Sequence, residues 1–196
     1  MIYNSLEVKR QLFHLVAGLI LAFLVYYSII TSFALLVLIL LHLLFSLLSL
    51  RYSVPLFGWF LNQFERNDDL SNFPGKGSLS VLVGAFIVVF LFSKEIAVAS
   101  LLILAVGDSI ASLVGTHYKK RKHPLNDLKS LEGSFLGFLF AFVFALLVIP
   151  WLEALLASLF AMIFESLEIK IFHRKLNDNI TIPIISAVVI SLLRII

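Results

Sequence analysis

Residues 107–134 read GDSIASLVGTHYKKRKHPLNDLKSLEGS, and this stretch decides how the chain can fold. It begins inside one strongly apolar segment, passes through the basic run KKRK at residues 119–122, and ends where another apolar segment begins. Asp108 lies within the first of these segments. Because a charge in hydrocarbon is costly, a carboxylate inside a membrane helix indicates a functional site. The stretch therefore predicts two membrane helices joined by a basic loop, with a site beside Asp108.

The composition is that of a membrane protein. Hydrophobic residues make up 61% of the 196 positions and charged residues 14%, whereas a soluble domain has about 45–50% and roughly 25%. The chain has no cysteine, which excludes disulfides, thiolate metal sites and a cysteine nucleophile. We expect a single membrane-embedded domain over residues 1–196, built as an all-α polytopic bundle. We also expect the first apolar run to be kept as a helix and not cleaved as a signal peptide.

Seven apolar segments approach the roughly 20 residues that a membrane-spanning helix needs. Three of them are short, so six spans is the alternative count. A further segment, residues 52–76, has aromatic residues followed by charged ones, which predicts a short interfacial helix and a polar loop. The seven predicted spans are residues 12–30, 32–50, 79–92, 96–114, 135–149, 152–164 and 180–196.

The basic residues predict the orientation of this bundle. With the N-terminus in the cytoplasm, seven spans place every Lys and Arg on the cytoplasmic side except Lys94 and Arg194, in agreement with the positive-inside rule. The C-terminus is then outside, across a cell membrane or an endoplasmic-reticulum-type membrane.

This orientation gives four helices a common starting face. The first, third, fifth and seventh helices all begin in the cytoplasm, where their free N–H groups can bind anions. We therefore expect an active site that faces the cytoplasm. Polar residues gather at these four starts: Arg10 and His14, Lys76, residues 129–134, and Asp178 with Asn179.

Small residues recur every four positions on both sides of the basic loop, as Gly107, Ala111 and Gly115 and again from Gly133 onward. This spacing lets membrane helices approach closely. Asp108 is then either held by hydrogen bonds between two tightly packed helices, or it lies in a polar pocket. In such a pocket it would bind Mg²⁺ or accept the proton of a lipid hydroxyl.

The run Lys129-Ser130-Leu131-Glu132-Gly133-Ser134 offers a cation, hydroxyls and a carboxylate at a helix start. It is either an ordinary N-cap or a site in which Lys129 holds phosphate and Glu132 is a second metal ligand or base. It is not a P-loop, whose pattern occurs nowhere in the chain. The basic run at 119–122 is more typical of a positive-inside determinant or an anionic-lipid contact than of a site.

Two further polar groups leave alternatives open. Arg10, His14 and Gly18 share a helix face, where they form either a satisfied interfacial cluster or a clamp for phosphate. Glu165, at the cytoplasmic end of the sixth predicted helix, fits a structural role as well as a functional one. On the residues alone, an anion and metal site faces the cytoplasm and opens sideways to lipid. That arrangement fits a lipid kinase, a lipid nucleotidyltransferase or a transporter.

The chain carries a central pattern of Gly-Asp, a following Ala and Gly, a basic loop and Lys-Ser-x-Glu-Gly-Ser, in residues 107–115 and 129–134. Near its ends it has EVKRQLFH at residues 7–14, and Glu165 followed by DNITIP at residues 178–183. With these motifs the sequence resembles the dolichol kinase, phytol kinase and CTP-dependent diacylglycerol kinase family, over nearly the whole chain. One departure is Gln11, which stands where the family usually has a second basic residue.

The resemblance implies a kinase that transfers the γ-phosphate of CTP, or of UTP, to the hydroxyl of a membrane lipid alcohol. The alcohol would be a polyprenol such as dolichol, phytol or geranylgeraniol, or diacylglycerol. Mg²⁺ or another divalent cation is implied as cofactor, with Asp108 and Glu132 as ligands and Asp108, Lys129 and Glu132 as catalytic residues. Lipid or phosphate contacts are expected from Arg10, His14 and Glu165. Nucleotide contacts are expected from Lys76, Gly107, Gly115, Lys129, Ser130, Gly133, Ser134, Asp178 and Asn179.

Two other functions remain open. A CDP-lipid-forming phosphatidate cytidylyltransferase uses the same nucleotide with a lipid phosphate, but the Lys-Asp and Gly-rich ending of that family has no match in the chain. A non-enzymatic membrane transporter would use Asp108 for ion coupling, but broken helices in two corresponding halves are not evident in the sequence.

Overall fold

The computed structural model of the chain describes residues 5–65, 73–117, 121–123, 126–167, 170–171, 174–175 and 177–195. Two small antiparallel hairpins lie between helices, β1 (Lys122–His123) with β2 (Asn126–Ser130) and β3 (Lys170–Ile171) with β4 (Arg174–Lys175). The π-helical stretch η1 lies in the middle of one continuous helix, Lys94–His117. In chain order the helices are α1 (Ser5–Tyr26), α2 (Ser32–Ser49), α3 (Pro55–Phe64), α5 (Lys76–Leu91), α6 (Lys94–Leu102), η1 (Ile103–Asp108), α7 (Ser109–His117), α8 (Leu131–Ala145), α9 (Trp151–Ser166) and α10 (Asp178–Leu193).

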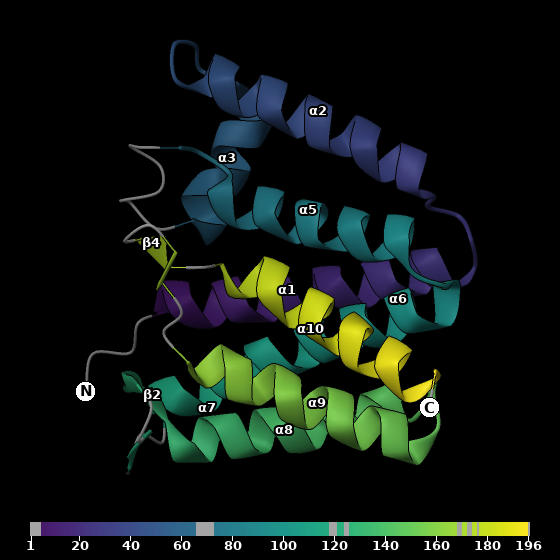
Figure 1. The fold of residues 1–196 in the computed structure, drawn as a ribbon. Coiled ribbons are helices and arrows are strands. Elements are labelled where there is room, and N and C mark those ends of the chain that lie inside the picture. Colours follow the sequence, from purple (N-terminus) through teal and green to yellow (C-terminus); the bar gives the residue numbers. More distant parts are fainter. Residues whose placement is uncertain are drawn as a thin grey trace.

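The long helices run alternately between two ends of the molecule (Figure 1). α1, α5, α8 and α10 begin at the end that holds the hairpins, and α2, the α6–η1–α7 helix and α9 return to it. The four polar helix starts found in the sequence therefore lie at one end of the molecule.

Three of the described helices are long and apolar enough to cross a membrane: Ser5–Tyr26, Ser32–Ser49 and Lys94–His117. α5, α8 and α10 are apolar but have only 15 or 16 residues. At 1.5 Å per residue they are about 24 Å long, against roughly 30 Å for a hydrocarbon core. The all-helical fold is confirmed, and α3 is the short helix expected within residues 52–76. The count of seven spans and their orientation stay predictions.

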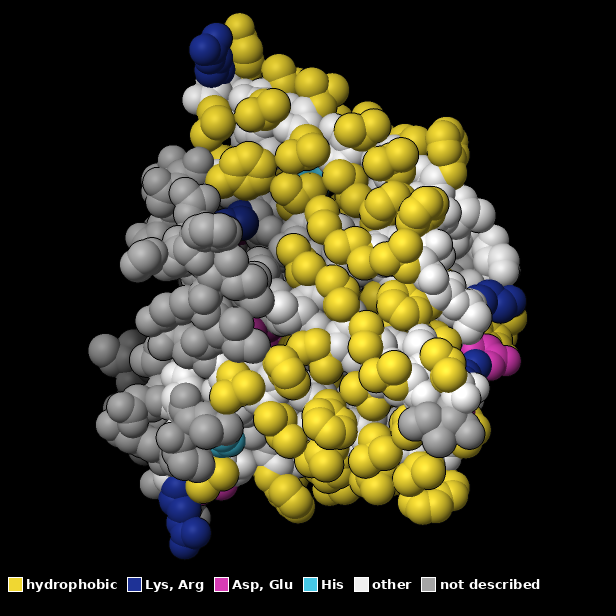
Figure 2. Space-filling model, in the orientation of Figure 1, with side chains coloured by type: hydrophobic (Ala, Val, Ile, Leu, Met, Phe, Trp, Pro, Cys, Tyr) yellow, Lys and Arg dark blue, Asp and Glu magenta, His cyan; other side chains and the backbone are white. Residues whose placement is uncertain are grey.

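Apolar side chains cover much of the molecular surface. On the face shown in Figure 2 they spread over the middle, and the Lys, Arg, Asp and Glu side chains lie toward its left and right edges. Phe33, Leu56 and Leu147 are each more than 70% exposed. Soluble monomers rarely expose contiguous apolar patches larger than a few hundred Å². This surface therefore indicates contact with lipid.

The α6–η1–α7 helix forms the centre of the bundle. Of its most apolar 18-residue window, 78% is buried, against 22% for α1 and 11% for α2. α1, α8, α9 and α10 all pack against it. Asp108 is therefore carried by the most buried of the three long helices.

Glycines let α8 approach the end of this central helix. A Cβ at Gly137 would lie 2.7 Å from the carbonyl oxygen of Gly107, and a Cβ at Gly133 would lie 2.5 Å from that of Ala111. Neither distance leaves room for a side chain. The close approach that the spacing of small residues predicts is present in the structure.

Gly137→Ala should destabilise the protein, because the new methyl group would overlap Gly107 and the Met162 side chain. Overpacking costs about 1–3 kcal/mol, which exceeds the gain of about 1 kcal/mol that Ala has over Gly in a helix. Gly58→Ala in α3 is the control, since a Cβ there meets nothing within 4 Å. Thermal unfolding in detergent should give a lower midpoint for Gly137→Ala and an unchanged or higher one for Gly58→Ala. Equal midpoints would contradict this packing.

Candidate active site

Three carboxylates meet at the end of the molecule where α1, α5, α8 and α10 begin. Asp108 is the last residue of η1, Glu165 lies near the end of α9, and Asp178 is the first residue of α10. One oxygen from each lies within 4.8 Å of the other two. Glu165 is fully buried, while the side chains of Asp108 and Asp178 are 13% and 23% exposed. Three separate helices thus build one acidic site that solvent can reach.

Lys129, in β2, is the cation that stabilises this cluster. Its ammonium group contacts Glu165 Oε1 and lies 3.7 Å from Asp178 Oδ2. Burial lowers the pKa of Lys129, but the carboxylates of Glu165, Asp108 and Asp178 outweigh burial and hold that pKa above its usual value. Three carboxylate groups and one ammonium group therefore lie together in this cluster.

Local backbone structure explains where the three acids lie. The π-helical turn of η1 ends at Asp108, and such turns occur frequently at functional sites. Asp178 lies in the first turn of α10, where the helix dipole stabilises a negative charge. The Asn177 side chain caps that turn by accepting a hydrogen bond from Asn179 N at 3.0 Å. Glu165 lies near the C-terminal end of α9, where the helix dipole disfavours a carboxylate. The negative charge of Glu165 is therefore stabilised by Lys129.

The β1–β2 hairpin brings Lys129 to the cluster and ends at the start of α8. Ser130 is the N-cap of α8, and its Oγ accepts a hydrogen bond from Gly133 N at 3.0 Å. The run at residues 129–134 therefore forms the helix N-cap that was one of its two predicted roles. Ser134, in the first turn, has its Oγ 2.9 Å from Ser166 Oγ, the residue after Glu165.

The structure brings Glu165 to Asp108, and it does not bring Glu132 there. Glu132 lies in the first turn of α8, where its carboxylate accepts a hydrogen bond from Arg121 N at 3.4 Å. Within the described part of the chain, Glu132 is not a member of the converging group of acids. Its predicted role as metal ligand or base stays a prediction. The rest of the basic run, residues 119 and 120, lies outside the described residues.

Several residues expected to contact nucleotide have packing roles. A Cβ at Gly107 would lie 2.9 Å from Met162 Sδ, and one at Gly115 would lie 3.3 Å from Ser130 Oγ. The amide of Asn179 donates to Ser80 Oγ at 2.9 Å and so links α10 to α5. These contacts leave nucleotide binding by the same residues untested.

The start of α5 already holds an anion. Gly75 has φ of 82°, a left-handed conformation that favours glycine. The Glu65 carboxylate accepts hydrogen bonds from Gly75 N at 2.6 Å and from Gly77 N at 3.5 Å. It thereby occupies the anion position that this helix start offers. Lys76 is exposed beside it, and contact of Lys76 with nucleotide stays a prediction.

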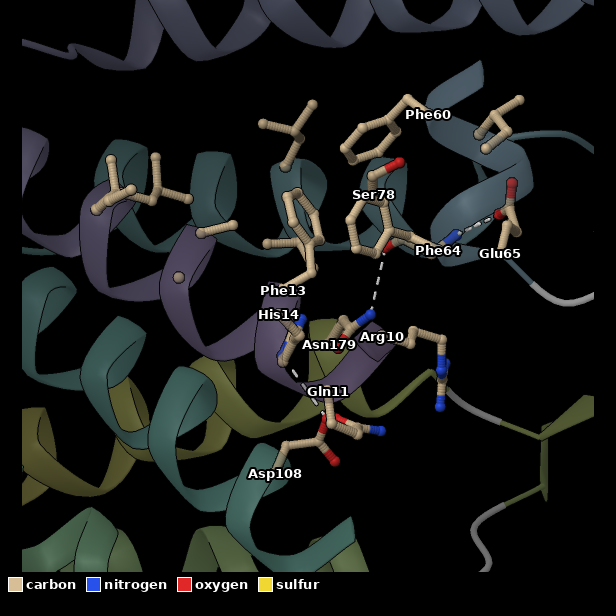
Figure 3. Close-up of a pocket in the computed structure, with 18 of the residues that line it drawn as sticks. Arg10, Gln11, Phe13, His14, Phe60, Phe64, Glu65, Ser78, Asp108 and Asn179 are labelled. Carbon is tan, nitrogen blue, oxygen red and sulfur yellow. Dashed lines mark hydrogen bonds and ion pairs between the residues drawn. The ribbon is translucent and has the colours of Figure 1, made fainter. Parts of the chain in front are cut away.

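A cavity of about 420 Å³ extends from the acidic site between α1, α3 and α5 (Figure 3). Asp108 lines it at the polar end, where His14 Nε2 lies 3.6 Å from Asp108 Oδ2. Phe13, Phe60 and Phe64 pack on one another toward α3, with ring centroids 4.7–5.0 Å apart. Asp108 therefore belongs both to the carboxylate cluster and to the wall of an apolar cavity.

Sequence reasoning missed two polar residues of this region. Gln11 lines the polar end of the cavity, and the sequence marks it only as a departure from a family pattern. Its position between Arg10 and His14 at a polar helix start is a signal that could have found it. Glu65 was treated as part of a polar loop, and nothing local indicates that it caps a helix start ten residues later.

Comparisons with known proteins link the chain to a kinase only in part. It is 28% identical over 187 residues to an uncharacterized protein of Methanocaldococcus jannaschii, covering 94% of this chain and 93% of that protein. It is 27% identical over 187 residues to an uncharacterized protein of Rickettsia prowazekii, covering 91% and 90%. A protein of Glycine max named probable phytol kinase 1, chloroplastic, is 31% identical over 111 residues, which are 49% of this chain and 36% of the kinase. No family model and no solved structure matches the chain.

Lys129→Met should destabilise the protein by about 3–5 kcal/mol, the usual cost of leaving a buried charge without its partner. The double variant Lys129→Met/Glu165→Gln should recover most of that loss, because it removes the buried anion together with its cation. Unfolding in detergent of the wild type, both single variants and the double variant gives the coupling energy between the two sites. We expect it to exceed about 1 kcal/mol. Additive effects would mean that the two side chains do not form an ion pair.

Proposed function

We propose that this protein is a multi-pass membrane kinase that transfers the γ-phosphate of CTP to the hydroxyl of a lipid alcohol at the cytoplasmic face. The observation that carries the proposal is the position of Asp108, which belongs to a carboxylate cluster and to an apolar cavity at once. A nucleotide comes from water and a lipid alcohol from the bilayer, so their reaction needs a charged site and an apolar site that meet. The central motif and the partial match to a phytol kinase support the same reaction.

We assign the divalent cation, Mg²⁺, to Asp108, Glu165 and Asp178. Carboxylate oxygens are ligands that Mg²⁺ prefers, and it is usually held by one or two carboxylates together with substrate phosphates. The convergence of one oxygen from each of three carboxylates suits a cation at this position. When bound, the ion would neutralise charge on the phosphates during transfer. This assignment gives Asp108 the partners Glu165 and Asp178 in place of Glu132.

We assign the steps of the proposed reaction to these residues. The lipid hydroxyl oxygen attacks the γ-phosphorus of CTP, the bond between that phosphorus and the β–γ bridging oxygen breaks, and lipid monophosphate and CDP leave. Asp108 is the one acid of the cluster that also lines the cavity, so we assign to it the proton of the hydroxyl. Lys129, beside Glu165, would hold the phosphates as a point charge. Phosphoryl transfer depends mostly on such positioning and charge neutralisation.

Asp108→Asn should abolish transfer of label from γ-labelled CTP to lipid. Purified protein in detergent would be incubated with Mg²⁺, labelled CTP and, in separate reactions, polyprenol, phytol, geranylgeraniol, diacylglycerol or phosphatidate. Label in the organic phase should appear with at least one alcohol, and the variant should retain less than about 1% of it, because a general base contributes 10²–10⁴-fold. Glu153→Gln is the matched control, since Glu153 pairs with Arg194 at the opposite end of the molecule and should be dispensable.

The same assay identifies the competing functions. Label that leaves as pyrophosphate only with phosphatidate would indicate a cytidylyltransferase. If Asp108→Asn and the wild type label lipid at equal rates, the protein is a kinase but Asp108 does not take part in the reaction. No turnover with any acceptor would contradict the CTP-dependent kinase and favour a transporter.

Chelation of divalent cations should abolish the activity, and Mg²⁺ should restore it. Asp178→Asn removes one of the three assigned ligands, so it should raise the Mg²⁺ concentration for half-maximal activity by about tenfold or more, because loss of only an outer-shell partner of a ligand already costs about 10–100-fold in metal affinity. Glu95→Gln is the control, because Glu95 pairs with Arg194 far from the cluster. An unchanged Mg²⁺ dependence in Asp178→Asn would contradict the assignment of this ligand.

A further inference from the structure

Two layers of charged side chains bound the apolar part of the bundle. In the layer opposite the hairpins, Arg194 donates hydrogen bonds to Glu95 and Glu153. The layer at the hairpin end is the acidic cluster. The central helix, α9 and α10 each carry one charge of each layer, so the helical rise per residue gives the separation of the layers three times. The three values are about 20, 18 and 24 Å, between Glu95 and Asp108, Glu153 and Glu165, and Asp178 and Arg194.

The exposed apolar surface of the outer helices has nearly the same height. On α2 it extends from Phe33 to Leu50. On α8 it extends from Leu131 to Leu147. These stretches are about 24–26 Å long, and any tilt of a helix reduces its height across a membrane. An average hydrocarbon core is about 30 Å thick. The apolar surface of the protein is therefore several Å too short for an average bilayer.

Tryptophan and tyrosine side chains mark the edges of this surface. Such side chains concentrate at membrane–water interfaces, where their amphipathic rings lie at the level of the headgroups. The described part of the chain contains five of them, and all are 50–67% exposed. Tyr26, Tyr27 and Trp151 lie at the end opposite the hairpins, and Tyr52 and Trp59 at the hairpin end. α2, which connects the two ends, is only about 27 Å long, so the hydrocarbon between these rings is thinner than average.

We infer that the protein preferentially binds phospholipids with acyl chains shorter than those of an average bilayer, around a hydrocarbon core of about 24 Å. A bilayer that is thicker than the apolar surface has to thin beside the protein, at a cost that rises with the mismatch. Short-chain lipids avoid that cost, so they should be enriched in direct contact with the protein. The binding surface is the exterior of helices such as α2 and α8 and not the cavity, so the inference does not rest on the proposed function.

Competition between lipids for this surface tests the inference. The chain has two tryptophans, and in Trp59→Phe the remaining one, Trp151, is 64% exposed at the edge of the surface. This variant would be reconstituted with a brominated phosphatidylcholine, which quenches tryptophan fluorescence, and with one unbrominated phosphatidylcholine from a series of about 12 to about 22 carbons per chain. A lipid that binds well displaces the quencher and restores fluorescence. We expect the highest relative affinity at about 14–16 carbons and an affinity at least about twofold lower for the longest chains.

Two further variants in the same Trp59→Phe background show whether the apolar surface sets this preference. Phe33→Asp/Leu147→Asp places carboxylates at two positions that are each more than 70% exposed at the end opposite the hairpins. Aspartate is too short to reach the membrane surface as lysine does, so the apolar surface is shortened and the maximum should move to a shorter lipid. Leu56→Asp is the matched control, because Leu56 is 83% exposed on α3, outside the measured surface, and it should leave the maximum unchanged.

Three results would overturn the inference. They are equal affinity across the series, a maximum at about 18 carbons or more, which matches an average bilayer, and an unmoved maximum in Phe33→Asp/Leu147→Asp. Lipid binding is measured directly, so each result has the same meaning whether or not the protein phosphorylates a lipid. Loss of kinase activity would therefore leave the inference standing, and loss of the short-chain preference would leave the kinase standing.

Discussion

The ion pair between Lys129 and Glu165 joins segments that lie far apart in the chain, and the shape of the acidic site depends on it. Glu165 is fully buried at the C-terminal end of α9, where the helix dipole adds to the repulsion from Asp108 and Asp178. In a medium of low dielectric constant such a group of like charges is costly without a cation. Lys129 supplies that cation from the β1–β2 hairpin. Lys129 on the hairpin therefore has to lie beside the end of α9 and the start of α10.

The central helix supports this arrangement through packing of another kind. In lipid the association of helices gains little from the hydrophobic effect, so it depends on close contact between small residues. Gly107 and Gly137 give that contact directly beside Asp108, which fixes the position of the aspartate relative to α8. At the opposite end, Arg194 joins Glu95 and Glu153 and so ties the end of α10 to the starts of α6 and α9. The helices are thus fixed at both ends, and the acidic site lies at the end where four helices begin.

The sequence predicts the helices well because lipid demands long apolar runs and close packing demands small residues at regular spacing. The sequence also marks Asp108 and Lys129 as candidate site residues, since each is a charged residue within or next to an apolar segment. It does not predict which acids lie beside Asp108. Several acids lie near helix ends, and only some of them converge on Asp108. The rotation of α9 and α10 against the central helix decides which ones do, and no local sequence pattern predicts that rotation. The position of Gln11 is hidden for a related reason, because the cavity that it lines exists only after α1, α3 and α5 have packed together.

The cavity along α1 also bears on how a lipid substrate of the proposed kinase would be selected. Burying a methylene group from water is worth about 0.8 kcal/mol, but the tail of a membrane lipid already lies in hydrocarbon. Moving it from the bilayer into an apolar channel therefore gains little, however many carbons it has. In the proposed kinase, selection would then come from the shape of the cavity and from hydrogen bonds at its polar end. Gln11 and His14 lie at that end, on the helix whose next turns line the cavity. One helix would thereby place polar side chains beside Asp108 and also line the cavity that extends from it.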